Sequence, residues 1–183
     1  SSHPKDATFE LIDTIIECDK ICKHLHLPFQ SGSNRILKAM NRIYTREHYL
    51  EIVDYARSKL PEFSFSSDII IGFPNETYED FLATMNLIEY VKFDNIYTFI
   101  YSKRSGTKAA EIVDSTSEAD KTKWMRILLS KQREIATVQY RRFIGMSLEV
   151  LAEAEGKSGG DYLTGRSNEF IIVEFKAPKD KIG

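Results

Sequence analysis

The feature that most constrains the fold is the run Ile69-Ile70-Ile71, which ends a segment of alternating aromatic and polar residues that starts at Phe63. A continuous β-branched run fits a strand that is covered on both faces, as in a parallel sheet. Helical patterns precede and follow this segment, and further strand patterns recur at intervals of about 30 residues. The sequence therefore predicts an α/β fold of repeated βα units, with parallel strands and right-handed connections.

The boundaries of the expected elements follow from spacing and from helix-breaking residues. Strands are expected over residues 21–29, 63–71 and 94–102. Helices are expected over residues 7–17, 33–40, 49–60 and 81–91. Three parallel strands leave an open sheet edge, which natural proteins avoid, so the sheet is expected to pair with a partner or to belong to a longer barrel.

The character of the chain changes after Ser102. Residues 103–118 are polar and irregular, and a long helix is predicted from about Ala119 to Phe143, closed by Gly145. Residues 121–142 hold seven basic residues and one acidic residue. Such a face is either solvated or in contact with nucleic-acid phosphates.

The last residues predict a second, smaller unit. Short strands over residues 148–151, 161–164 and 170–175 are separated by glycine-containing turns, a pattern typical of a small antiparallel barrel. The chain reaches Gly183 too soon to close such a barrel. We therefore expect two domains, residues 1–146 and residues 147–183.

Charge and cysteine content exclude several classes of protein. The 25 Lys and Arg residues nearly balance the 27 Asp and Glu residues, which excludes a globally basic nucleic-acid binder but allows local basic patches. Two cysteines cannot form a secreted disulfide framework, and no apolar run approaches the roughly 20 residues that cross a bilayer. The expectation is a cytoplasmic protein that does not associate with membranes.

Polar or glycine-containing segments follow all three expected strands. They are Gln30-Ser31-Gly32-Ser33, then Gly72 to Thr77, then Tyr101 to Arg104. Ligands of parallel βα folds bind at the carboxyl ends of the strands, where helix N-termini also offer free N–H groups. A serine-capped helix and a tight turn with a capping box explain the first two segments equally simply. Asp68, within the second strand, is either a carboxylate of the barrel interior or a solvated charge.

Metal and nucleophile motifs are weak. Cys18 and Cys22 are spaced C-x3-C near His24 and His26, but no second cysteine pair accompanies them, so no metal ligand is assigned. No catalytic triad, phosphate-binding loop of the Walker type or pair of metal-binding carboxylates can be assembled. No catalytic residue is therefore assigned to this chain.

Taken together, the segments resemble the radical S-adenosylmethionine (SAM) methylthiotransferases, most closely those that modify tRNA. The matching segments are Ser2–Pro4, Leu25–Ser33, Leu37–Glu47, Asp68–Phe81, Tyr101–Ala110 and Gly165-Arg166. The resemblance implies half of a radical SAM (βα)6 partial barrel, followed by a truncated TRAM-like module, a small β-barrel that binds RNA.

The resemblance also implies an activity and its cofactors. The family uses SAM and [4Fe-4S] clusters to add a methylthio group to C2 of N6-isopentenyladenosine in tRNA; sister enzymes act on a ribosomal protein or on threonylcarbamoyladenosine. The Cys-x3-Cys-x2-Cys loop that holds the cluster is not among these residues, so this chain is expected to be inactive alone. A non-catalytic RNA-binding module is the other alternative. Asn75 stands where the family usually has glycine, a mild change because Asn tolerates the left-handed conformation.

Site residues carry over from the matching motifs as expectations. The residues implied at the cofactor are Gln30, Ser31, Ser33, Asp68, Tyr101 and Ser102. Arg104 and Arg166 are expected to contact RNA. Half a barrel also exposes the edge of the 63–71 or the 21–29 strand, so self-association through that edge is expected.

Overall fold

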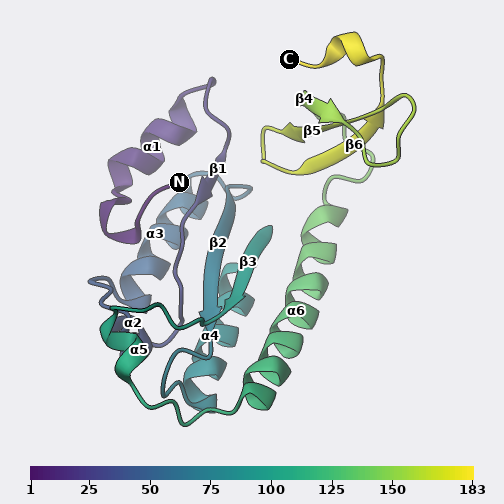
Figure 1. The fold of residues 1–183 in the computed structure, drawn as a ribbon. Helices are drawn as coiled ribbons and strands as arrows, with labels where there is room; N and C mark the ends of the chain where they lie inside the picture. The colour runs from purple at the N-terminus through teal and green to yellow at the C-terminus, as the bar shows by residue number, and fades with distance from the viewer.

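A three-stranded parallel sheet forms the centre of the computed structural model, which describes residues 1–183 (Figure 1). Its strands are β1 (His24–His26), β2 (Ser64–Ile71) and β3 (Asn95–Ile100), in the order β1-β2-β3. The parallel βα arrangement expected from the sequence is confirmed, and the carboxyl ends of the three strands lie at one edge of the sheet.

Six α-helices connect and flank these strands, and most begin at a side chain that caps them. They are α1 (Phe9–Glu17), α2 (Asn34–Ala39), α3 (Arg46–Lys59), α4 (Tyr78–Val91), α5 (Lys108–Glu111) and α6 (Glu118–Arg141). Short 3-10 helices cover Pro4–Asp6 and Lys179–Lys181. Thr77 and Asp80 form the expected capping box at the start of α4.

One face of the sheet carries the core. Alternate residues of β2, among them Phe65, Ile69 and Ile71, are fully buried, in a cluster of 23 residues that includes side chains of α1, α3, α4 and α6. Ile70 lies on the other face and is only half-buried. The expectation that the isoleucine run is covered on both faces is therefore wrong at Ile70, because an open groove lies over that end of the second face.

The C-terminal residues form a separate antiparallel sheet of β4 (Val150–Glu155), β5 (Tyr162–Ser167) and β6 (Ile172–Lys176). Figure 1 shows this sheet beyond the end of α6, away from α2 and α5. It contacts the amino end of the parallel sheet, where the Lys23 N–H donates to the Asn168 carbonyl at 3.1 Å and the His24 ring stacks on Phe170 at 4.5 Å.

Several boundaries differ from those expected. β1 has three residues instead of nine, and beyond it Gln30 pairs with Ile69 only through an isolated bridge. α6 ends at Arg141, before Gly145, and the segment 103–118 contains the short helix α5. No helix has the length and apolar character needed to cross a membrane.

The two edges of the sheet are β1 and β3, since each of these strands pairs only with β2. β2 pairs on both sides, so the expectation that the 63–71 strand exposes an edge is wrong. β1 pairs only with β2, and on its outer side the Ser2 N–H donates to the His26 carbonyl at 3.0 Å. The N-terminal residues therefore occupy part of the edge to which another strand could pair.

Candidate functional site

A groove of about 1060 Å³ opens at the carboxyl ends of the three parallel strands. Residues from every strand end line it, and five of the eight expected site residues are among them: Gln30, Asp68, Tyr101, Ser102 and Arg104. The structure thus brings together side chains separated by up to 74 positions in the sequence. Ser31, Ser33 and Arg166 do not line the groove.

Gln30 adopts an unusual backbone conformation where β1 approaches the groove. Its φ angle is 68°, in the left-handed region that residues other than glycine and asparagine seldom occupy. Two hydrogen bonds to β2 hold it there: its N–H donates to the Asp68 carbonyl at 2.9 Å, and its carbonyl accepts from Ile70 at 3.0 Å. Backbone strain of this kind concentrates at functional sites.

The charged side chains of the groove are mostly cationic. Lys38, Arg42, Arg104 and Lys108 line it, and Asp68 is its one acidic residue. This balance favours a ligand with anionic groups, such as a carboxylate or phosphate.

Aromatic side chains give the groove surfaces on which a base could stack. Phe99 is 53% exposed, and Tyr101 packs edge-on against Phe73 with ring centroids 5.1 Å apart. Stacking on aromatic rings is a common way for proteins to hold a base. Together with Gln30 and Asp68, these rings can hold a nucleoside by stacking and hydrogen bonding at once.

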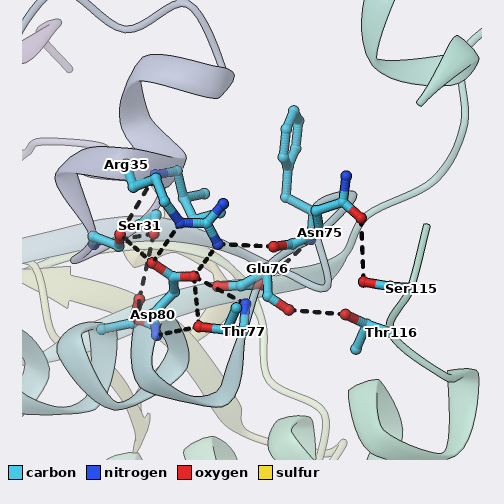
Figure 2. A network of polar contacts seen from close by, with 12 residues as sticks. Ser31, Arg35, Asn75, Glu76, Thr77, Asp80, Ser115 and Thr116 are labelled. Atoms are coloured by element: carbon cyan, nitrogen blue, oxygen red, sulfur yellow. Dashed lines mark hydrogen bonds and ion pairs between the residues drawn. The ribbon is translucent and has the colours of Figure 1, made fainter. Parts of the chain in front are cut away.

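Ser31 and Ser33 are buried outside the lining of the groove, in a network of hydrogen bonds. Figure 2 shows this network around Ser31 and Asp80. The Ser31 hydroxyl accepts from the Ser33 N–H at 3.2 Å, and the Ser33 hydroxyl donates to Asp80 at 2.6 Å. Ser33 also caps α2. Gly32 between them lies so close to α4 that a Cβ atom would be 2.4 Å from the Ala83 carbonyl oxygen. These serines fix the loop that follows β1.

Asp80 is the centre of the network (Figure 2). Its carboxylate accepts hydrogen bonds from Ser33, Arg35 and Thr77, and it pairs with the Arg35 guanidinium. Burial opposes its ionisation, but these hydrogen bonds outweigh burial and lower the pKa of Asp80 to about 2.

Glu76 is buried within the loop that follows β2 and binds the backbone of that loop. It is 1% exposed and accepts hydrogen bonds from the N–H groups of Gly72 and Phe73, while its Oε1 has no partner. Burial raises the pKa of Glu76 to about 7. Asn75 has the left-handed φ of 64° that its position requires.

The segment before α6 clamps this same loop, a contact that the sequence did not indicate. The Thr116 hydroxyl donates to the Glu76 carbonyl at 2.8 Å, and the Ser115 hydroxyl donates to the Asn75 side chain at 3.2 Å (Figure 2). Lys121, from the basic helix, is 3% exposed and pairs with Asp114 at 2.6 Å. The acidic residues Asp114 and Glu118 precede Lys121 in the sequence, and they were the signal from which its ion pairing could have been expected.

Arg166 lies at the other end of the parallel sheet. Its guanidinium pairs with Glu153 and covers the Phe170 ring at 4.9 Å. It lines a hollow of about 150 Å³ that includes Ser64, the first residue of β2. Arg104 lines the groove at the opposite end of β2, beside Asp68 and Ile70. The length of β2, about 25 Å, therefore separates the two residues expected to contact RNA.

Helix α6 presents four basic side chains that form neither an ion pair nor a hydrogen bond. Lys121, Lys131 and Arg142 are paired with acidic residues. The unpaired ones are all exposed and are Lys123, Arg126, Arg133 and Arg141. At 100° per residue they lie within about 80° of one another, along roughly 27 Å of the helix. We call them the basic stripe.

No group of three or more His, Cys, Asp or Glu side chains is placed to hold a metal ion. Cys18 is partly buried and Cys22 is exposed, and neither is in a disulfide.

Comparisons with known proteins agree with this geometry. Residues 2–88 match the Radical SAM superfamily profile. The coproporphyrinogen III oxidase of Escherichia coli, described as a radical SAM enzyme, superposes with a TM-score of 0.60 at 14% identity, over 98% of this chain and 51% of the oxidase. That likeness shows a shared fold.

Closer relatives match over the whole chain. The tRNA-2-methylthio-N(6)-dimethylallyladenosine synthase of Thermoanaerobacter pseudethanolicus is 48% identical over 183 residues, which are 39% of its length. That of Syntrophomonas wolfei is 46% identical over 183 residues, 41% of its length. The chain thus spans about two fifths of the relatives it matches. It belongs to the radical SAM superfamily, in the family of the tRNA-2-methylthio-N(6)-dimethylallyladenosine synthases.

Proposed function

We propose that this chain forms the SAM-binding and tRNA-binding part of a methylthiotransferase that modifies C2 of N6-isopentenyladenosine in tRNA. The observation that carries the proposal is the groove at the carboxyl edge of the sheet, where Gln30, Asp68 and Tyr101 converge. The names of the relatives support this substrate over a ribosomal protein or threonylcarbamoyladenosine. Its place of action is then the cytoplasm, where tRNA is modified.

The donors in the groove fit SAM. The Asp68 carboxylate suits the ribose hydroxyls or the ammonium group, the cationic wall suits the carboxylate, and Phe99 and Tyr101 suit the adenine. Bound beside a reduced [4Fe-4S] cluster, SAM supplies the radical chemistry that activates the C2 position. Within the groove the protein binds and orients the reactants and excludes water. Ser31 and Ser33, expected at the cofactor, contribute by positioning the loop that carries Gln30.

The cluster itself needs ligands from outside this chain. Fe–S clusters of this type are held by several cysteine thiolates, whereas the sequence has two cysteines, Cys18 and Cys22. These lie between α1 and β1, at the amino end of the sheet, away from the groove. We therefore assign them no part in holding the cluster.

tRNA would contact the basic stripe and Arg104. Unpaired, exposed lysines and arginines are the residues that neutralise phosphates without breaking existing ion pairs. The antiparallel sheet β4–β6 is proposed to be the TRAM-like RNA-binding module of residues 147–183, with Arg166 beside the Phe170 ring as a site for RNA. The stripe runs from the groove end of the parallel sheet to this module.

A chimera tests the proposed function. Residues 1–183 would replace the matching two fifths of the Thermoanaerobacter pseudethanolicus synthase, and the reconstituted enzyme would be assayed for methylthio-adenosine in tRNA by mass spectrometry. We expect product, and at least tenfold less of it with Asp68→Asn. Glu149→Gln, a matched acidic residue outside the groove, serves as control. A folded chimera that binds its clusters but forms no product contradicts the proposal.

The basic stripe and the two-cysteine count also favour a second candidate, a non-catalytic RNA-binding module. Titration of the 183-residue chain with tRNA at varied salt shows whether the chain binds RNA, and the activity of the chimera separates the two candidates. Removing the four charges of the stripe should reduce the slope of log K against log salt by about 3. Binding with that salt dependence, combined with an inactive chimera, would favour the binding module.

A further inference from the structure

A line of polar side chains crosses the polar face of the parallel sheet, joined by two hydrogen bonds and one longer histidine–carboxylate contact. His24 Nε2 lies 2.9 Å from the Ser66 hydroxyl, which lies 2.9 Å from His26 Nδ1. His26 Nε2 lies 3.5 Å from Asp68 Oδ1. The four residues project from neighbouring positions of β1 and β2, because Leu25 pairs with Phe65 and alternate side chains share a face.

Counting protons gives this line a direction. A hydroxyl has one proton, so Ser66 can donate to only one of the two histidines. A neutral His26 facing the Asp68 carboxylate needs its proton on Nε2, which leaves Nδ1 as an acceptor. Ser66 then donates to His26 Nδ1, and His24 must donate from Nε2 to Ser66. Every donor in the line therefore points toward Asp68.

The two ends of the line open on different hollows. Asp68 lines the groove, whereas His24 and Ser66 line the hollow of about 150 Å³ under the antiparallel sheet. That volume has room for water. Burial, with smaller contributions from the neighbouring His26 and the N-terminal amine, lowers the pKa of His24 to about 4, so His24 is neutral at pH 7 as the line requires.

We propose that His24, Ser66 and His26 form a proton relay that delivers a proton from water in the hollow to the Asp68 carboxylate, and through it to the groove's ligand. The ligand atom served is a basic nitrogen or an anionic oxygen. The relay concerns the proposed SAM and nucleoside site, but its geometry does not depend on which reaction occurs there.

The transfer is balanced. The Nε2 proton of His26 passes to Asp68, the Ser66 hydroxyl proton to His26 Nδ1, and the His24 Nε2 proton to Ser66. Water returns a proton to His24 Nδ1, which has no hydrogen-bond partner in the protein. Each member ends with as many protons as it began with, and both histidines end in their other tautomer. The ligand gains the proton that the water loses, and the hydroxide left in the hollow is neutralised by solvent.

Other ionisable groups face the same line from each packed element. Tyr97 of β3 packs edge-on against His26 at 5.8 Å. Around the small hollow the groups are Asp94, Tyr140, Arg166 and Glu169. Asp94 is bound by Ser64 and Arg142, and Arg166 is paired with Glu153. Neither Asp94 nor Arg166 therefore competes for the histidines.

Nitrogen-15 NMR of the 183-residue chain at pH 7 tests the relay without cofactor or tRNA. We expect His26 to carry its proton on Nε2, with Nδ1 as an unprotonated acceptor, and His24 to carry its proton on Nε2. His3 and His48, outside the line, are internal references. A His26 protonated on Nδ1 would overturn the proposal in the unsubstituted protein.

Two substitutions test the connection. Asp68→Asn removes the charge, so exchange of the His26 Nε2 proton with water should become about fivefold faster. The same substitution should change the His24 signals, and that change should fall by at least half in Ser66→Ala. Ser67→Ala, on the opposite face of β2, is the control for changes in the strand. An equal response of His24 with and without Ser66 would refute the relay, whereas chimera activity decides the proposed function separately.

Discussion

The two faces of the parallel sheet are built from the same strands and differ in nearly every other respect. On the covered face, Phe65 and Ile69 are fully buried against helices. On the other face, Ser66 and Asp68 belong to a line of polar contacts, and Phe99 is 53% exposed. Because side chains alternate along a strand, one segment can provide stability on one face and ligand chemistry on the other. Substitutions on the two faces should therefore have different consequences.

The largest effect is expected from matched phenylalanine substitutions on opposite faces. Phe65→Ala removes a fully buried ring and should lower the free energy of unfolding by about 3–5 kcal/mol. Phe99→Ala should change it by less than about 1 kcal/mol, because the ring is half exposed. Urea unfolding of both variants checks this. Equal losses in the two variants would contradict the claim that the covered face provides the stability of the sheet and the polar face does not.

The next largest effect on stability is expected from the hydrogen-bond network around Asp80. Asp80→Ala leaves Ser33, Arg35 and Thr77 without their acceptor and should cost about 2–3 kcal/mol. The folded-state pKa of about 2 lies below the unfolded value, so this contribution is complete above about pH 4 and is lost as the pH falls toward 2. Unfolding measured at pH 7 and pH 2.5 should show a large and a small difference from the unsubstituted chain. A difference independent of pH would contradict the assigned ion pair.

Glu76 should show the opposite dependence on pH. Its folded-state pKa of about 7 lies above the ordinary value of 4.5, so the folded protein binds the extra proton and loses stability as the pH rises from 4.5 to 7. Between pH 5 and pH 8, Glu76→Gln should reduce this loss in the free energy of unfolding by about 2 kcal/mol. Unfolding at pH 5 and pH 8 is the measurement. An unchanged slope in the variant would show that Glu76 is not the group responsible.

The smallest effect concerns the edges of the sheet. β1 and β3 are the edges of the sheet, and Ser2 occupies part of the β1 edge, so the chain should self-associate at high concentration. Ser2→Pro removes the N–H that binds the His26 carbonyl and should tighten association by roughly two- to fivefold. Sedimentation and light scattering check both points. A stable monomer at high concentration, in either form, would contradict an available edge.

Much of this arrangement follows from local sequence signals. The parallel strands, the Thr77–Asp80 capping box and the left-handed Asn75 were predictable because each depends on residues close together in the chain. The groove was predictable in outline, since Gln30 and Tyr101 both follow strands of one sheet.

The rest depends on contacts between distant segments. A serine after a strand can face either a ligand or the protein, and Ser33 faces Asp80, 47 residues away. Lys121 belongs to a basic helix by sequence, yet its pairing with Asp114 depends on how the segment 103–118 folds back over Gly72. The stacking of His24 on Phe170 joins two sheets, and no periodicity in either predicts it.

The most direct test of the central claim is equilibrium binding of SAM to the chimeric synthase, with substitutions at the two ends of the polar face. We expect Gln30→Ala and Asp68→Asn, in the groove, to weaken binding at least tenfold. Tyr140→Phe and Glu169→Gln, at the small hollow, should leave it unchanged. Weaker binding from the hollow variants, with the groove variants unaffected, would contradict the assignment of the cofactor to the carboxyl edge.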